Sequence, residues 1–257
     1  MKYSDDKIQG LNDFYQALEV KNRALLLKLI DLHQSLNNDE AKKFLMQGVG
    51  RRLKIVTRCL ENVFVIFPPD REGMLSDEEL SDVAINIHAY FINIAGLFDN
   101  LAWVFVYENE LFGEHKEQKL NRFDVGLFNK KTLAKIKPEL KDYLTQEPIA
   151  SWYKTYSKGY RDALAHRVPL YVPPATLNED ETKIYKSIED EINNLDLSNL
   201  NGLEKWGELL ESQKQLGSIS MFFAHSAADN GPAPLHAQLT CDYLTVEEVV
   251  EKFCIHF

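Results

Sequence analysis

The chain has 257 residues, is 45% hydrophobic and carries 29 Lys and Arg against 39 Asp and Glu, a formal net charge of −10. This length and apolar content suffice to bury a sizeable core, so we expect an ordinary soluble protein. The acidic balance argues against a surface built for non-specific binding of nucleic acid, which normally shows as a basic balance.

No apolar run reaches the roughly 18 to 20 residues of a membrane span, and the N-terminus "MKYSDDKIQG" has no signal-peptide pattern, so we expect no membrane contact and a cytoplasmic location. The three cysteines, Cys59, Cys241 and Cys254, lie far apart and never form a C-x-x-C pair. This spacing favours neither a disulfide framework nor a zinc site.

The first half of the chain reads as long helices. Ser4 and Asp5 are suited to cap a helix that runs to about Leu36, and a second helix is predicted from Asp39 to Phe67, where Pro68 and Pro69 end it. Residues Ser76 to Glu79 form a capping box, in which Ser and Glu satisfy each other's free backbone donors. The helix that they open is predicted to reach Phe112. It is apolar nearly all round, so we expect it to be the buried centre of a bundle.

Polar residues recur on this central helix. Asn86, Asn93 and Asn100 follow one another every seven residues, with Ala89 and Gly96 close to the same stripe. One interpretation is that the asparagines bond to one another or to a neighbouring helix and fix its register. The other is a polar seam that lines a pocket or a two-fold interface facing a later helix.

The second half of the chain is more broken. After Phe112 we expect short pieces, and then a helix from Pro148 to about His166 or Arg167, ended by Pro169. Acidic helices should follow over Glu179 to Leu195 and Leu203 to Leu216. "SISMFFAHS" and "PLHAQLTCDY" look like two short strands, and Thr245 is predicted to cap a closing helix. The fold class is therefore mainly α, a helical bundle with a small β-hairpin near residues 218–242.

Charge is unevenly distributed along the chain. Residues Lys116 to Arg167 hold 12 Lys and Arg against 6 Asp and Glu, a net charge of +6. Residues Leu177 to Leu216 hold 4 against 10, a net charge of −6. Such runs are typical of solvated faces, which here would attract each other across the fold or across a dimer.

Candidate functional residues gather in "YRDALAHRVPLYVPP", at the end of the predicted helix before Pro169. Asp162 and His166 are four residues apart and share a helix face, so the carboxylate is placed to hold one ring nitrogen and leave the other for proton transfer. Arg161 offers a bidentate fork for a phosphate. Arg161 and His166 differ by about 140° on a regular helix, so they converge only if the helix unwinds or a second chain supplies one of them.

The run Arg161-Asp162-Ala163-Leu164-Ala165-His166 resembles the R-x4-6-H signature of the HEPN superfamily, in which a polar residue usually follows the arginine. The resemblance implies a helical bundle with a HEPN-like core at about residues 39–172, inside a single domain of residues 1–257. Residues 175–257 would form a C-terminal extension of helices and a β-hairpin. It also implies a homodimer, because the active sites of many members form between two protomers.

The resemblance implies a metal-independent endoribonuclease that cleaves RNA by attack of the ribose 2′-hydroxyl. Arg161 would bind phosphate, His166 would transfer the proton and Asp162 would orient it. The alternative is a non-catalytic HEPN-like module that binds nucleotide, RNA or a protein partner. The net charge favours the second function, and the basic segment from Lys116 to Arg167 favours the first.

Other chemistry has little support. His225, Asp229, His236 and Asp242 match no metal-ligand spacing, and strand ends and turns explain their polarity better. Asp99 and Asn100, on the central helix, fit a buried hydrogen-bonded pair better than an acid-base dyad. The chain has no phosphate-binding loop, dinucleotide fingerprint or H-E-x-x-H motif, so we expect neither a cofactor nor a metal.

Overall fold

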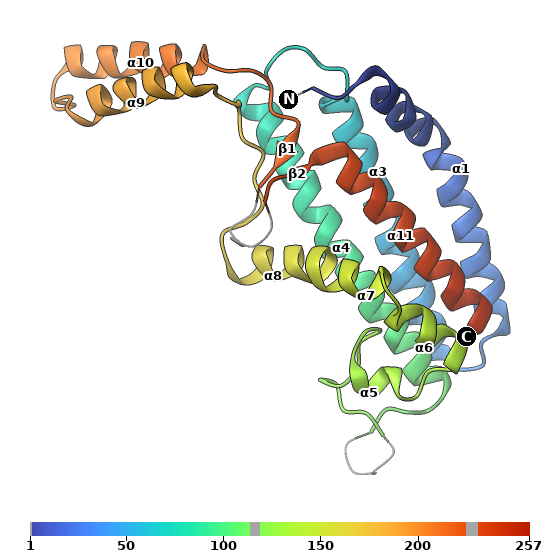
Figure 1. Ribbon diagram of the computed structural model, residues 1–257. Coiled ribbons are helices and arrows are strands. Elements are labelled where there is room, and N and C mark those ends of the chain that lie inside the picture. Colours follow the sequence, from blue (N-terminus) through green and yellow to red (C-terminus); the bar gives the residue numbers. More distant parts are fainter. Residues whose placement is uncertain (1, 114–118, 225–230) are drawn as a thin grey trace.

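The computed structural model describes residues 2–113, 119–224 and 231–257. Within these ranges the chain forms nine continuous helices and one small antiparallel sheet, and 71% of it is helical. The prediction of a mainly α protein is therefore confirmed. Figure 1 shows long helices side by side in a bundle, with a helical hairpin that projects away from it.

Two long helices open the chain, as the apolar spacing predicted. Helix α1 spans Asp5–Ser35, and the Ser4 side chain makes no capping hydrogen bond with it. The second helix is continuous but has three parts, of which the middle one is a π-helix: α2 (Asp39–Lys43), η1 (Phe44–Gly50) and α3 (Arg51–Ile66).

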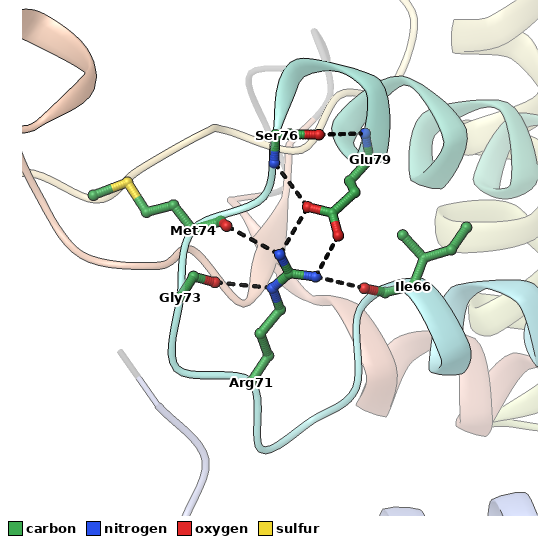
Figure 2. A network of polar contacts seen from close by, with 6 residues as sticks. All are labelled: Ile66, Arg71, Gly73, Met74, Ser76 and Glu79. Atoms are coloured by element: carbon green, nitrogen blue, oxygen red, sulfur yellow. Dashed lines mark hydrogen bonds and ion pairs between the residues drawn. The ribbon is translucent and has the colours of Figure 1, made fainter. Parts of the chain in front are cut away.

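The turn between α3 and α4 is fixed by one arginine. The Arg71 guanidinium donates to both Glu79 carboxylate oxygens, at 2.8 and 2.7 Å, and to the carbonyls of Ile66, Gly73 and Met74 (Figure 2). Glu79 also accepts from the Ser76 amide, while its own amide donates to the Ser76 hydroxyl. The predicted capping box is confirmed, and Arg71 extends it into a clasp that joins the two helices.

Helix α4 (Asp77–Glu108) is the central element. It ends four residues before the predicted Phe112, because Glu110 adopts a positive φ of 51° that a helix does not tolerate. By length and composition α4 is apolar enough to cross a membrane, contrary to the expectation that no stretch would be. Because 56% of that stretch is buried inside the bundle, it behaves as the core helix of a bundle does.

The basic segment folds into short helices and one longer one. Helices α5 (Lys130–Leu133) and α6 (Pro138–Thr145) lie beside the C-terminal end of α4 (Figure 1). Next comes the helix predicted from Pro148, in three continuous parts: α7 (Ile149–Trp152), the π-helix η2 (Tyr153–Ser157) and α8 (Lys158–His166). Arg167 is extended, so the predicted end of this helix is confirmed.

The acidic residues form a helical hairpin outside the bundle. It consists of α9 (Glu179–Asn193) and α10 (Leu200–Lys214), close to the two predicted acidic helices. Neither helix has a buried residue. Figure 1 shows the hairpin projecting beside the N-terminal end of α4.

The C-terminal region departs most from prediction. The hairpin is only β1 (Phe222–Phe223) and β2 (Ala233–Pro234), and α11 spans Leu235–His256. The predicted strand in "PLHAQLTCDY" is wrong after Pro234, and Thr245 lies inside α11, bonded to the Cys241 carbonyl, instead of capping a helix. The reason is the helical spacing of its buried residues, which include Leu235, Leu239, Tyr243, Val246 and Val250. Because α11 packs against α1, α3 and α6, part of the expected extension belongs to the bundle core.

One carboxyl group lies inside this core. Asp242 of α11 is fully buried, and its Oδ1 accepts from Trp152 Nε1 at 2.7 Å and from Gln238 Nε2 at 2.8 Å. Its Oδ2 is buried without a partner among the described residues. Burial raises the pKa of Asp242 to about 7, and the two hydrogen bonds oppose this shift.

Asp242 should make stability depend on pH. The folded protein keeps a proton that the unfolded chain releases from a carboxyl with an ordinary pKa of 3.8, so this contribution is present below that pH and lost as pH rises through about 7. We expect the free energy of unfolding of wild type, measured in urea, to fall relative to Asp242→Asn between about pH 5 and about pH 8. His236 is present in both proteins and cancels. A constant difference would contradict a buried, protonated Asp242.

Candidate functional site

Helix α8 carries the three predicted site residues across the middle of α4. Its buried residues are Tyr160 and Ala163, and the Tyr160 ring lies 4.6 Å from that of Phe91 on α4. Beyond the helix, His88 of α4 shares a hydrogen bond of 2.6 Å with the Leu170 carbonyl. These contacts on one face of α8 leave Arg161 and Asp162 partly exposed on the other.

The predicted partners are not the observed ones. Arg161 Nη1 lies 3.0 Å from the Asp162 carboxylate, and Lys158 Nζ lies 3.7 Å from it. No hydrogen bond or ion pair joins Asp162 to His166, although the structure describes both residues. His166 is the last residue of α8 and is exposed. Asp162 therefore holds the arginine, and the expectation that it holds the imidazole is not met within this chain.

Asp99 of α4 interacts electrostatically with two arginines. Its carboxylate lies within range of the positive charges of Arg161 on α8 and of Arg52 on α3. Burial raises the pKa of Asp99, and these two cations lower it in part. Three helices thus bring two guanidinium groups and a carboxylate to one region of the surface.

Arg52 is held in place by amide groups. Its Nε donates to Asn100 Oδ1 at 3.0 Å and its Nη1 donates to Asn93 Oδ1 at 3.1 Å. The guanidinium lies directly on Gly96, where a Cβ atom would come within 2.4 Å of its central carbon. No described carboxylate lies within ion-pair distance of Arg52. Its charge is therefore positioned by neutral groups and remains available to an anion.

Tyr153 completes the cluster from η2. Its ring stacks on Phe128 at 3.8 Å and meets Phe98 of α4 edge-on at 6.3 Å. Burial raises the pKa of Tyr153, Asp99 raises it further, and Arg161 opposes both. The phenol stays protonated at neutral pH and is therefore able to donate a hydrogen bond in this region.

Both π-helical segments adjoin this cluster. Gly48 of η1 faces Asn100, where a Cβ atom would lie 2.7 Å from the side-chain carbon, and η2 begins at Tyr153. Single π-helical turns are frequent at functional sites, because the extra residue re-aims side chains. We call Arg52, Asp99, Tyr153, Arg161 and Asp162 the arginine cluster.

The arginine cluster has the chemistry of an anion site. Two guanidinium groups offer fork-shaped donors, which suit phosphate oxygens, and the Tyr153 hydroxyl offers another donor. His166 is the group able to exchange a proton near neutral pH, but it is five residues from Arg161 on a regular helix and points elsewhere. Within one chain the cluster thus offers donors that suit an anion, and no hydrogen bond or ion pair joins His166 to Arg161.

The asparagine stripe bonds mainly to the neighbouring helix. Asn93 and Asn100 accept from Arg52, and Asn86 accepts from Asn62 of α3 at 2.9 Å. The interpretation that they fix the helix register is therefore supported, and the seam faces α3 and not α8. Asp99 makes no hydrogen bond with Asn100, and although its carboxyl is partly desolvated the residue still reaches the surface, so the expected buried pair does not form.

Sequence reasoning missed Arg52 and Tyr153. The signal for Arg52 was Gly96, a glycine in the middle of an apolar helix, which marks a close approach by another group. In the sequence, His225, Asp229, His236 and Asp242 show no metal-ligand spacing, and the structure describes only two of these four residues. His225 and Asp229 lie outside the described residues, and the described part of the chain contains no group of three metal-ligating side chains. His236 bonds to the Phe67 carbonyl and Asp242 to Trp152.

Comparison with models of protein families, with curated proteins and with solved structures finds no match to this chain.

The contact between Gly96 and Arg52 yields a matched pair of variants. Gly10→Ala on α1 meets nothing within 4 Å, so it should stabilise the helix by roughly 1 kcal/mol. Gly96→Ala should lose much of that gain, because the new methyl group displaces Arg52 from Asn93 and Asn100. Urea unfolding of both variants measures the difference. Equal stabilisation would show that the guanidinium contributes nothing in this position.

Proposed function

We propose that the protein is a metal-independent endoribonuclease of the HEPN type. The observation that carries the proposal is the arginine cluster: Arg161, the arginine of the R-x4-6-H run, and Arg52, which neutral amides hold, both act on the Asp99 carboxylate. His166, the histidine of that run, is exposed at the end of the same helix. A phosphate site on one protomer, combined with the accessible imidazole of a second, suits cleavage of a phosphodiester.

The reaction moves one proton away from the ribose and one to the leaving group. His166 takes the proton of the 2′-hydroxyl, the 2′-oxygen attacks phosphorus, and the bond from phosphorus to the 5′-oxygen breaks. The departing 5′-oxygen takes a proton, which leaves a 2′,3′-cyclic phosphate and a 5′-hydroxyl. Arg161 and Arg52 stabilise the charge that builds on the phosphate oxygens. Asp162 positions Arg161, with which it pairs at 3.0 Å.

A second copy of the chain completes the site in this proposal. Since Arg161 and His166 point about 140° apart on one helix, a two-fold arrangement is needed to bring the Arg161 of one protomer to the imidazole of the other. The open face of α4, between α3 and α8, suits this contact, because Ile92 and Ile85 lie exposed on it, seven and fourteen residues before Asp99. Ile55 and Val65 of the neighbouring helix α3 are also exposed.

The second candidate is a non-catalytic module that binds an anionic ligand, nucleotide or RNA at the arginine cluster, or a protein partner. The observation in its favour is that Asp162 engages Arg161 and leaves His166 without a contact to it. An arginine already paired with a carboxylate suits binding and register better than acid-base chemistry.

Cleavage of mixed RNA in EDTA separates the two functions. We expect 2′,3′-cyclic phosphate ends, and no cleavage where the scissile ribose is 2′-deoxy. Arg161→Ala and His166→Ala should each lower the rate by roughly 10² to 10⁴. Arg161→Lys should stay impaired, because a point charge does not replace a bidentate fork.

Arg23→Ala and His33→Ala are the controls, since both residues lie on α1, on the other side of the bundle from α8 (Figure 1). Both controls should keep wild-type activity. If wild type leaves every RNA intact while binding it through Arg161 and Arg52, the non-catalytic function is correct.

A further inference from the structure

The helical hairpin formed by residues 177–216, which we call the arm, has an uncovered apolar surface. No residue in it is buried, although it carries large apolar side chains. Leu200, Leu203 and Trp206 follow at three-residue spacing along α10, and Leu200 is 70% exposed. Ile184 of α9 and Leu197 of the connecting turn are also exposed. Apolar side chains in this density favour a covered surface.

Among the described residues, the arm meets the body at its base. Lys214 pairs with Asp77 at 2.9 Å, and a hollow of about 750 Å³ separates the arm base from the start of α4. Thr176 and Ser218 exchange two backbone hydrogen bonds, of 2.8 and 3.0 Å. They lie where the chain enters the arm and where it returns to the body. The arm is therefore a projection closed at its base, and its outer surface is free for another molecule.

The charge of the arm has its counterpart at the far end of the body. The arm holds 10 Asp and Glu against 4 Lys and Arg, a net charge of −6. The described part of the basic segment, residues 119–167, holds 11 Lys and Arg against 5 Asp and Glu, a net charge of +6. The arm lies beside the N-terminal end of α4, while α5 and α6 of the basic segment lie beside its C-terminal end (Figure 1). Within one chain the two surfaces are kept apart.

We propose that the arm of one protomer docks on the basic segment of a second copy of the chain. An antiparallel two-fold arrangement of α4 helices places the N-terminal end of each beside the C-terminal end of the other, so both arms meet a basic segment at once. Arm-to-arm pairing is disfavoured, because it would bring two net charges of −6 together. Phe123, 83% exposed at the start of the basic segment, offers apolar area to the arm.

This proposal deepens the dimer of the proposed function, since it states which surfaces join the two protomers and in which direction they run. Exposed cations on the basic segment supply the docking charge. They include Lys130, Lys135, Lys141 and Lys154. None of the four forms an ion pair within the described residues, so they remain available to an acidic partner.

Two charge-reversal variants, one in the arm and one in the basic segment, test the docking. One variant combines Glu189→Lys, Asp190→Lys and Glu204→Lys in the arm; the other combines Lys130→Glu, Lys135→Glu and Lys141→Glu in the basic segment. Each alone should weaken self-association, measured by analytical ultracentrifugation, by at least about tenfold. A mixture of the two should associate again as a heterodimer, because both of its contacts are then complementary. Weakened association without recovery in the mixture would overturn the proposal.

Removal of the arm gives an independent result. Residues 178–216 are replaced by a short Gly-Ser linker, with Gly217 kept because its φ of +92° suits glycine. The bond pair of Thr176 and Ser218 should preserve the base, and the shortened protein should dissociate to monomers at concentrations where wild type is dimeric. Trp206→Glu should weaken association likewise, while Val20→Glu, a matched exposed apolar position on α1, should not. A shortened protein that stays dimeric overturns the proposal.

The outcome is separable from that of the proposed function. Arm docking is measured by the mass of the assembled species, without reference to activity. Cleavage is lost in His166→Ala whether or not the arm docks. If the charge-reversal pair recovers association but wild type cuts no RNA, only the nuclease fails. If wild type cuts RNA but the shortened protein associates as strongly as wild type, only the arm proposal fails.

Discussion

The burial of α4 is the constraint on which the rest of the structure depends. The helix is apolar around most of its surface, and it is covered mainly by the second helix (α2, η1 and α3) and by α8. They leave one stripe open, on which Ile85, Ile92 and Asp99 follow at seven-residue spacing. Burial of a large apolar side chain is worth about 1.5 to 3 kcal/mol, so the positions of the covering helices have little freedom. The arginine cluster lies where this open stripe meets α3 and α8.

The same packing explains how a positive charge is kept near the surface without a carboxylate partner. Gly96 removes a side chain from α4, Arg52 of α3 fills the space, and two asparagine oxygens accept its hydrogen bonds. The two amides fix the orientation of the guanidinium. Because they are neutral, they do not compensate its positive charge. The Arg71 clasp joins α3 to α4 at their connected ends and keeps the two helices in one register (Figure 2).

Much of the fold could be predicted from the sequence, because the patterns that mark helix starts, ends and faces are local. The Ser76 capping box, the prolines after Phe67 and His166, and the heptad of asparagines each depend on residues within a few turns. The strand expected in "PLHAQLTCDY" failed because a short apolar run does not distinguish a strand from a buried helix. Arg52 and Tyr153 were missed because their role comes from other helices. Residue spacing alone likewise did not predict that Asp162 pairs with Arg161 instead of with His166.

Cleavage by the proposed mechanism requires that Arg161 and His166 act together across two chains. Complementation between two inactive proteins measures this most directly. Arg161→Ala and His166→Ala are purified separately, mixed, allowed to exchange subunits and assayed on RNA in EDTA. If one protomer supplies the arginine and its partner the histidine, half of the dimers are mixed and one of their two sites is intact, so about a quarter of wild-type activity should return. A mixture as inactive as its two components would contradict a site shared between protomers.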